Sequence, residues 1–122
     1  MNFQHCYKIL LFMKRRPGMS VHDFRHYYES EHVPLALRSS KGLVRYVRRY
    51  LDPQPRPETG DGSDIGYDVI TELWFDNEKI FAATVRYLAS TLLSPEIIDD
   101  ETRLFDRRAT RMCTTVECID DF

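Results

Sequence analysis

Residues 14–36, KRRPGMSVHDFRHYYESEHVPLA, constrain the fold of this chain more than any other stretch. The Pro17-Gly18 dipeptide is typical of a turn and ends the apolar run before it. Ser20 can act as a helix N-cap, because its side-chain oxygen can accept from a free backbone N–H, and Asp23 occupies the capping-box position. The stretch therefore predicts the end of a strand, a turn and a capped helix in succession.

One face of this helix combines apolar side chains with a histidine. Spacings of three and four residues place the following side chains on that face: Val21, Phe24, Tyr28, His32 and Leu35. Pro34 predicts that the helix ends near His32, because the residue before a proline avoids the helical conformation. We therefore expect His32 in the last turn, facing inward but close to an edge, which suits a titrating group.

The rest of the chain alternates between extended and helical patterns. Short runs rich in β-branched and aromatic residues predict strands at 7–14, 43–51, 65–76 and 109–118. Asp76 or Asn77 can cap a second helix, whose apolar stripe is Phe81, Thr84, Val85, Leu88 and Leu92. Ser94 and Pro95 begin a short third helix. Residues 52–64 predict a long loop, because spaced prolines are followed by glycines.

This order predicts one α+β domain over residues 1–122. Its expected form is a ferredoxin-like βαββαβ unit, a four-stranded antiparallel sheet with helices on one face. The first and third strands have apolar residues on both faces, so the side of the sheet without helices also needs a cover. A second copy of the chain is the simplest cover, which predicts an isologous homodimer.

Composition and charge narrow the expected partners. A formal net charge of −2 gives no reason to expect nucleic acid or an anionic membrane. No run approaches the length of about 20 apolar residues that a membrane-spanning helix needs. The cysteines lack metal-site spacing, which favours reduced thiols in a cytoplasmic protein. His22 and His26 share a helix face, but no further metal ligand is evident. We expect no cofactor, because no Gly-rich phosphate loop or thiol motif is present.

Several of these features together resemble the EthD-domain family, which is named for ethyl tert-butyl ether degradation. The matching residues of the first block are Lys14, Pro17, Gly18, Ser20, Phe24, Tyr27, Tyr28, His32, Pro34 and Leu35. Residues 67–76, YDVITELWFD, resemble the strand before the family's second helix, and residues 99–106, DDETRLFD, resemble its acidic segment. The resemblance implies a dimeric α+β barrel, and it places the family's histidine at His32.

His32 is the first candidate for catalysis, because an imidazole can accept and donate a proton near neutral pH. A structural histidine that binds backbone carbonyls at a helix end is the alternative. Tyr28, one turn earlier, is the second catalytic candidate, since its hydroxyl can bind substrate or orient the imidazole. Packing in the core would be its structural role.

Further side chains are candidates for binding substrate. A pocket for an aromatic or apolar ligand can be lined by aromatic residues that could equally fill the core: Phe24, Trp74 and Phe75. Glu72 can act as a base, but we favour its pairing with Arg45 or Arg49 across the strands, because burying an unpaired carboxylate is costly. Asp100 resembles a family acid, although a solvated surface position is the simpler expectation.

The leading hypothesis is a cofactor-free enzyme in which His32 transfers protons on a small aromatic or apolar metabolite. The reaction class, a dehydration, cyclisation or other elimination, is implied by the resemblance, because family members resemble polyketide cyclases and dehydratases of the barrel fold. A cofactor-free oxygenase is the enzymatic alternative. A non-catalytic accessory or ligand-binding protein of a catabolic or biosynthetic pathway, and a structural dimerisation module, are the non-enzymatic ones.

Overall fold

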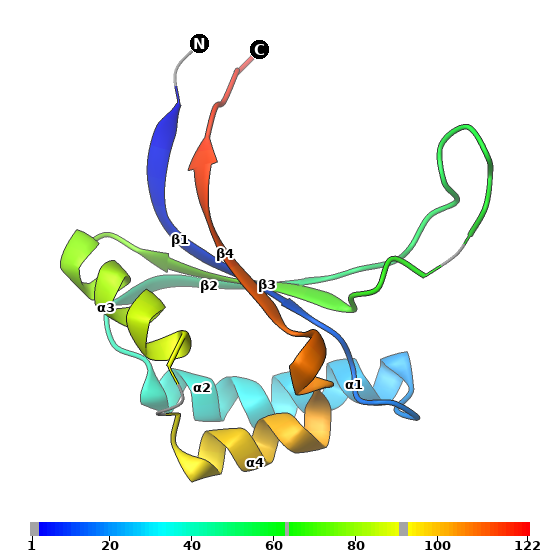
Figure 1. The fold of residues 1–122 in the computed structure, drawn as a ribbon, viewed down its shortest axis with the longest axis horizontal. Coiled ribbons are helices and arrows are strands. Elements are labelled where there is room, and N and C mark those ends of the chain that lie inside the picture. The colour runs from blue at the N-terminus through cyan, green and yellow to red at the C-terminus, as the bar shows by residue number, and fades with distance from the viewer. Residues whose placement is uncertain (1–2, 63, 91–92) are drawn as a thin grey trace.

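The computed structural model describes residues 3–62, 64–90 and 93–122. Its elements follow the predicted order of strand, helix, strand, strand, helix and strand (Figure 1). Ser63 of the predicted loop and Leu92 of the predicted second-helix stripe lie outside the described residues.

The strands form one antiparallel sheet. Their bounds are β1 Gln4–Met13, β2 Leu43–Tyr50, β3 Val69–Phe75 and β4 Arg111–Glu117. The strand order within the sheet is β2-β3-β1-β4, with every neighbouring pair antiparallel. This is the order of a ferredoxin-like unit, so the predicted α+β fold is confirmed. The central strands β1 and β3 turn alternate side chains toward the helices, and Ile9 and Val69 are fully buried there.

The helices begin where the sequence places capping residues. Their bounds are α1 Val21–Tyr27, α2 Val33–Ser39, α3 Glu78–Leu88 and α4 Pro95–Leu104. Ser20, Asn77 and Ser94 each accept a backbone N–H at the start of α1, α3 and α4. Figure 1 shows α1, α2 and α4 together on one side of the sheet, while the connection between β2 and β3 projects away from the body.

The first helix does not end near His32, and that prediction is wrong. A π-helical turn, Tyr28–His32, joins α1 to α2 and carries the helical path on to Ser39. In this wider turn the backbone N–H of Val33 bonds to the carbonyl of Tyr28, five residues back. Pro34 then falls in the first turn of α2, where a missing N–H costs little. The proline therefore follows a change in helix type rather than a helix end.

The core lies between the helices and the inward face of the sheet. Its buried cluster is Met13, Phe24, Tyr28, Val33, Val69, Leu104 and Phe105. The ring of Phe24 packs edge-on against Phe105, with centroids 5.8 Å apart. The sequence pattern places Val21 on the same buried face, which is wrong, because this residue starts the helix and is 39% exposed.

Phe24→Ala should lower the free energy of unfolding by about 3–5 kcal/mol, because it removes a fully buried ring. Val21→Ala, a control on the same helix, should change it by less than about 0.5 kcal/mol. Urea denaturation followed by circular dichroism, at one protein concentration, measures both variants. Equal effects would show that α1 is not anchored through Phe24.

Candidate functional site

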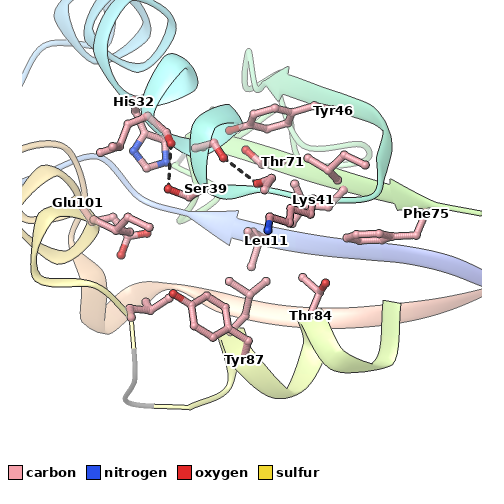
Figure 2. Close-up of a pocket in the computed structure, with 18 of the residues that line it drawn as sticks. Leu11, His32, Ser39, Lys41, Tyr46, Thr71, Phe75, Thr84, Tyr87 and Glu101 are labelled. Atoms are coloured by element: carbon pink, nitrogen blue, oxygen red, sulfur yellow. Dashed lines mark hydrogen bonds between the residues drawn. The ribbon is translucent and has the colours of Figure 1, made fainter. Parts of the chain in front are cut away.

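A pocket of about 390 Å³ opens between the inward face of the sheet and helices α2, α3 and α4 (Figure 2). This volume lies in the range of small-molecule sites. Much of the lining is apolar and comes from Leu11, Leu35, Leu43, Leu73, Phe75, Ile80 and Leu88. Polar groups also reach the pocket, among them His32, Tyr28 and Tyr46. The site therefore combines an apolar wall with a few hydrogen-bonding groups.

His32 enters the pocket from the π-helical turn and is 6% exposed. Its Nδ1 lies 2.7 Å from Oδ2 of Asp100, a buried residue of α4. In a neutral imidazole this contact places the proton on Nδ1, which donates to the carboxylate. Nε2 is then left as a hydrogen-bond acceptor, and a histidine oriented in this way can act as a base.

Asp100 is held by a second donor. The hydroxyl of Tyr27 donates to Oδ1 at 2.8 Å, so each carboxylate oxygen has its own partner. Burial and the hydrogen bond to Asp100 raise the pKa of Tyr27, which keeps this phenol protonated as a donor. The expectation of a solvated Asp100 is wrong, because α4 packs against the π-helical turn and covers the carboxylate. The pair of donors fixes the carboxylate that orients His32.

Two aromatic rings pack against the imidazole of His32 and fix its orientation. The ring of Tyr28 meets His32 edge-on with centroids 5.1 Å apart, and Phe105 does so at 5.5 Å. A side chain packed on two sides and hydrogen-bonded on a third has little rotational freedom. The direction of Nε2 is therefore set before any ligand enters.

Hydroxyl groups lie beside the histidine. The hydroxyl of the fully buried Tyr28 is 2.5 Å from Oγ1 of Thr71 on β3. Tyr46 of β2 lines the pocket and interacts with the hydroxyl of Tyr28. Burial raises the pKa of Tyr28 well above its usual value, and burial also raises the pKa of Tyr46. Both phenols are protonated at neutral pH, and Tyr46, which is only partly buried, can donate to an oxygen on which negative charge develops.

Glu29 ties the π-helical turn to β2. Its carboxylate accepts from Arg48 at 2.6 Å and 3.0 Å, and from the hydroxyl of Tyr50 at 2.5 Å. The hydrogen bonds from Arg48 hold the pKa of Glu29 below its usual value. This clamp keeps the turn that carries His32 against the sheet.

The structure brings some of the predicted site residues to the pocket and leaves others elsewhere. His32, Tyr28 and Phe75 line it. Phe24 lies in the core, with its ring centroid 6.0 Å from that of Tyr28. Asp100 is not a lining residue, but it bonds to His32, which is.

Glu72 and Trp74 lie on the open face of the sheet, the side without helices. Glu72 accepts from Nε of Arg49 at 2.5 Å and from the indole N–H of Trp74 at 2.8 Å. The favoured pairing of Glu72 with Arg49 is therefore confirmed. Arg45 stacks on the Trp74 ring instead, 4.6 Å from its centroid, and Lys8 stacks at 3.9 Å.

Sequence reasoning missed Tyr46, Thr71 and the partnership of Asp100 with His32. Tyr46 and Thr71 follow the strand alternation that marks the inward face, which was the available signal. The contact between Asp100 and His32 spans 68 positions and depends on how α4 docks, so no local pattern contains it.

Among residues 3–62, 64–90 and 93–122, no group of three or more His, Cys, Asp and Glu side chains is arranged to hold a metal ion. His22 and His26 stack on the exposed surface of α1, with ring centroids 6.4 Å apart. Within the same described part of the chain, no helix is long and apolar enough to cross a membrane.

Comparisons with known proteins agree with this architecture. The family model of the EthD domain matches residues 16–108. A solved protein of Arabidopsis thaliana has a TM-score of 0.51 and 11% identity, over 94% of this chain and 96% of that one. An EthD-like protein of Ralstonia eutropha JMP134 has a TM-score of 0.52 and 14% identity, over 93% of this chain and 89% of that one. These likenesses show a common fold. No curated protein sequence matches the chain.

Glu72→Gln should destabilise the fold by about 1 kcal/mol at neutral pH and have little effect in acid. Burial by itself would raise the pKa of Glu72, but the hydrogen bonds from Arg49 and Trp74 outweigh it and leave the pKa lowered. A carboxyl group with a lowered folded-state pKa stabilises the fold above its unfolded-state pKa of about 4.5, and this contribution disappears as the pH falls through the folded-state value.

Thermal denaturation between neutral pH and about pH 3 measures this dependence. Glu58→Gln, on the exposed loop between β2 and β3, is the control and should have no effect at either end. A difference between Glu72→Gln and the unmodified chain that stays constant across the range would contradict the prediction.

Proposed function

This chain belongs to the EthD domain family, and on that premise we propose that it is a cofactor-independent enzyme in which His32 moves protons on a small, largely apolar metabolite. The proposed reaction is of the lyase type, an elimination of water with or without ring closure. The observation that carries the proposal is the buried imidazole of His32, bonded to Asp100 and presented to an apolar pocket. An oriented histidine in a cavity of this kind is suited to general acid–base catalysis.

The proposed proton path uses one nitrogen twice. Nε2 of His32 takes a proton from a carbon next to a carbonyl group, and the electron pair of the broken C–H bond moves toward the carbonyl oxygen. Asp100, at Nδ1, stabilises the imidazolium that forms. The imidazolium then gives its proton to the departing hydroxyl group, which leaves as water while a carbon–carbon double bond forms. The histidine returns to its neutral state, so the cycle balances.

The tyrosine hydroxyls supply the matching electrostatic element. Negative charge grows on the carbonyl oxygen as the C–H bond breaks, and donors aimed at that oxygen stabilise the transition state. Tyr46 lines the pocket. Tyr28 contacts both Tyr46 and His32. The raised pKa of Tyr46 keeps its hydroxyl protonated, so Tyr46 is the phenol that can donate to that oxygen. The fully buried Tyr28 hydroxyl is held by Thr71 and supports Tyr46 from the core side.

His32→Gln and His32→Ala should each lower turnover at least about tenfold, because general acid–base catalysis contributes that much or more. The assay follows loss of water from a panel of aromatic β-hydroxy ketones by mass spectrometry. His26→Gln is the matched control, since His26 is exposed on α1 and lies outside the pocket. Circular dichroism verifies that all variants fold. Full activity in either His32 variant would remove this residue from the mechanism.

The same experiments separate the alternative functions. Oxygen uptake with phenolic substrates would identify a cofactor-free oxygenase. An accessory ligand-binding protein predicts that ligands raise the melting temperature without turnover, and that His32→Gln alters this little. The largely apolar lining of the pocket favours ligand binding in either case, so turnover decides between them.

We also propose that two copies of the chain pair through the open face of the sheet. Apolar side chains on this face are only partly covered: Leu10, Phe12, Val47 and Ile70. Helices cover the other face, and a second sheet would bury these residues by the usual symmetric contact of a homodimer. The result would be the two-sheet barrel that the family resemblance implies.

Leu10→Glu should convert the proposed dimer to a monomer at micromolar concentration, because it places a charge on the open face of the central strand β1, between Glu72 and Cys113. Leu37→Glu is the control, since Leu37 is 51% exposed on α2, away from this face. Light scattering during size-exclusion chromatography reports the mass of each variant. An unmodified chain that elutes as a monomer would overturn the proposal.

A further inference from the structure

Lys41 is the one Lys or Arg among the lining residues that the structure describes. It lies in the connection between α2 and β2, and Figure 2 shows its side chain reaching into the pocket from that connection. Leu11, Phe75 and Thr84 line the same cavity. A positive charge is therefore placed at the edge of a largely apolar space.

The ammonium group of Lys41 forms no ion pair with any residue in the described part of the chain. Glu101, the acidic lining residue, bonds to Arg107 at 3.2 Å instead. Other polar lining groups are also engaged, because the hydroxyls of Ser39 and Ser40 donate to carbonyls of α2. The charge of Lys41 is available to a ligand.

The backbone next to Lys41 is constrained. Gly42 has a φ of +77°, a backbone conformation that residues other than glycine rarely adopt. A Cβ at this position would lie 2.8 Å from Cγ2 of Ile80 on α3. The chain passes α3 closely because residue 42 is glycine, and this passage sets where Lys41 leaves the backbone. The backbone position from which the Lys41 side chain starts is thus part of the local fold.

We propose that the ligand of this pocket is a hydrophobic carboxylic acid whose carboxylate pairs with Lys41 while its apolar body contacts the leucine and phenylalanine wall. The proposal rests on the proposed function for the location of the ligand and adds its chemical class. Lys41 is exposed at the edge of the pocket, so its pairing with a carboxylate is screened by water and adds a modest gain to the contact between the apolar body and the wall. A neutral ligand of the same shape would leave that interaction unused.

The test compares the binding of 2-naphthoate with that of 2-naphthamide, a neutral probe of similar shape, to the full chain by isothermal titration calorimetry at neutral pH. The unmodified protein should bind the acid about threefold to fivefold more tightly than the amide, as expected for an ion pair to an exposed lysine. Lys41→Met should remove that preference, and Lys41→Arg should keep most of it. Lys79→Met, which removes an exposed lysine of α3 outside the pocket, should change neither affinity.

Each outcome supports the assignment of Lys41 or overturns it. Equal affinity for the two probes, no measurable binding of either probe, or an acid preference that survives in Lys41→Met would overturn it. His32→Gln separates this proposal from the catalytic one, since it should lower turnover at least about tenfold and keep the preference for the acid. Loss of turnover in His32→Gln with no effect of Lys41→Met would leave the enzyme proposal standing and the ligand class refuted.

Discussion

The hydrogen bond between His32 and Asp100 is the contact on which the candidate site depends. It joins residues 68 positions apart, so the pocket is complete only after α4 has docked against the π-helical turn. Burying a carboxylate or an imidazole without partners costs free energy, and here each group satisfies the other while Tyr27 supplies a further donor. The groups proposed to carry the chemistry therefore also hold two distant parts of the fold together.

The π-helical turn lets His32 and Pro34, which are two positions apart, lie in one continuous helical path. A wider turn changes which side chains face the sheet. The consecutive residues His32 and Val33 are both buried here. Such turns are rare and occur frequently at functional sites. Here Glu29 accepts hydrogen bonds from Arg48 and Tyr50, which fasten the turn to β2.

Much of the fold could be predicted because local patterns carry it. Ser20 and Ser94 cap helices where the sequence indicates, and the alternation of Val69, Thr71 and Phe75 gives the inward face of β3. The end of the first helix was not predictable, because Val33 adopts helical dihedrals of φ −58° and ψ −48° despite the proline that follows it, against the usual preference of such residues. The position of His32 in a pocket was expected, but its partner was not, since docking of α4 decides which carboxylate reaches the ring. Gly42 indicates the end of a connection in the sequence, but a single sequence does not show that this connection brings Lys41 to a pocket.

Trp74 is the single tryptophan of the chain, and it lies on the open face between Lys8 and Arg45. The indole fluorescence of this protein therefore arises on the side of the sheet opposite the pocket. Its emission wavelength and quenching by iodide report on what covers the open face, and they respond to a ligand in the pocket only through the sheet itself. A single optical signal thus distinguishes association of the sheets from occupancy of the cavity.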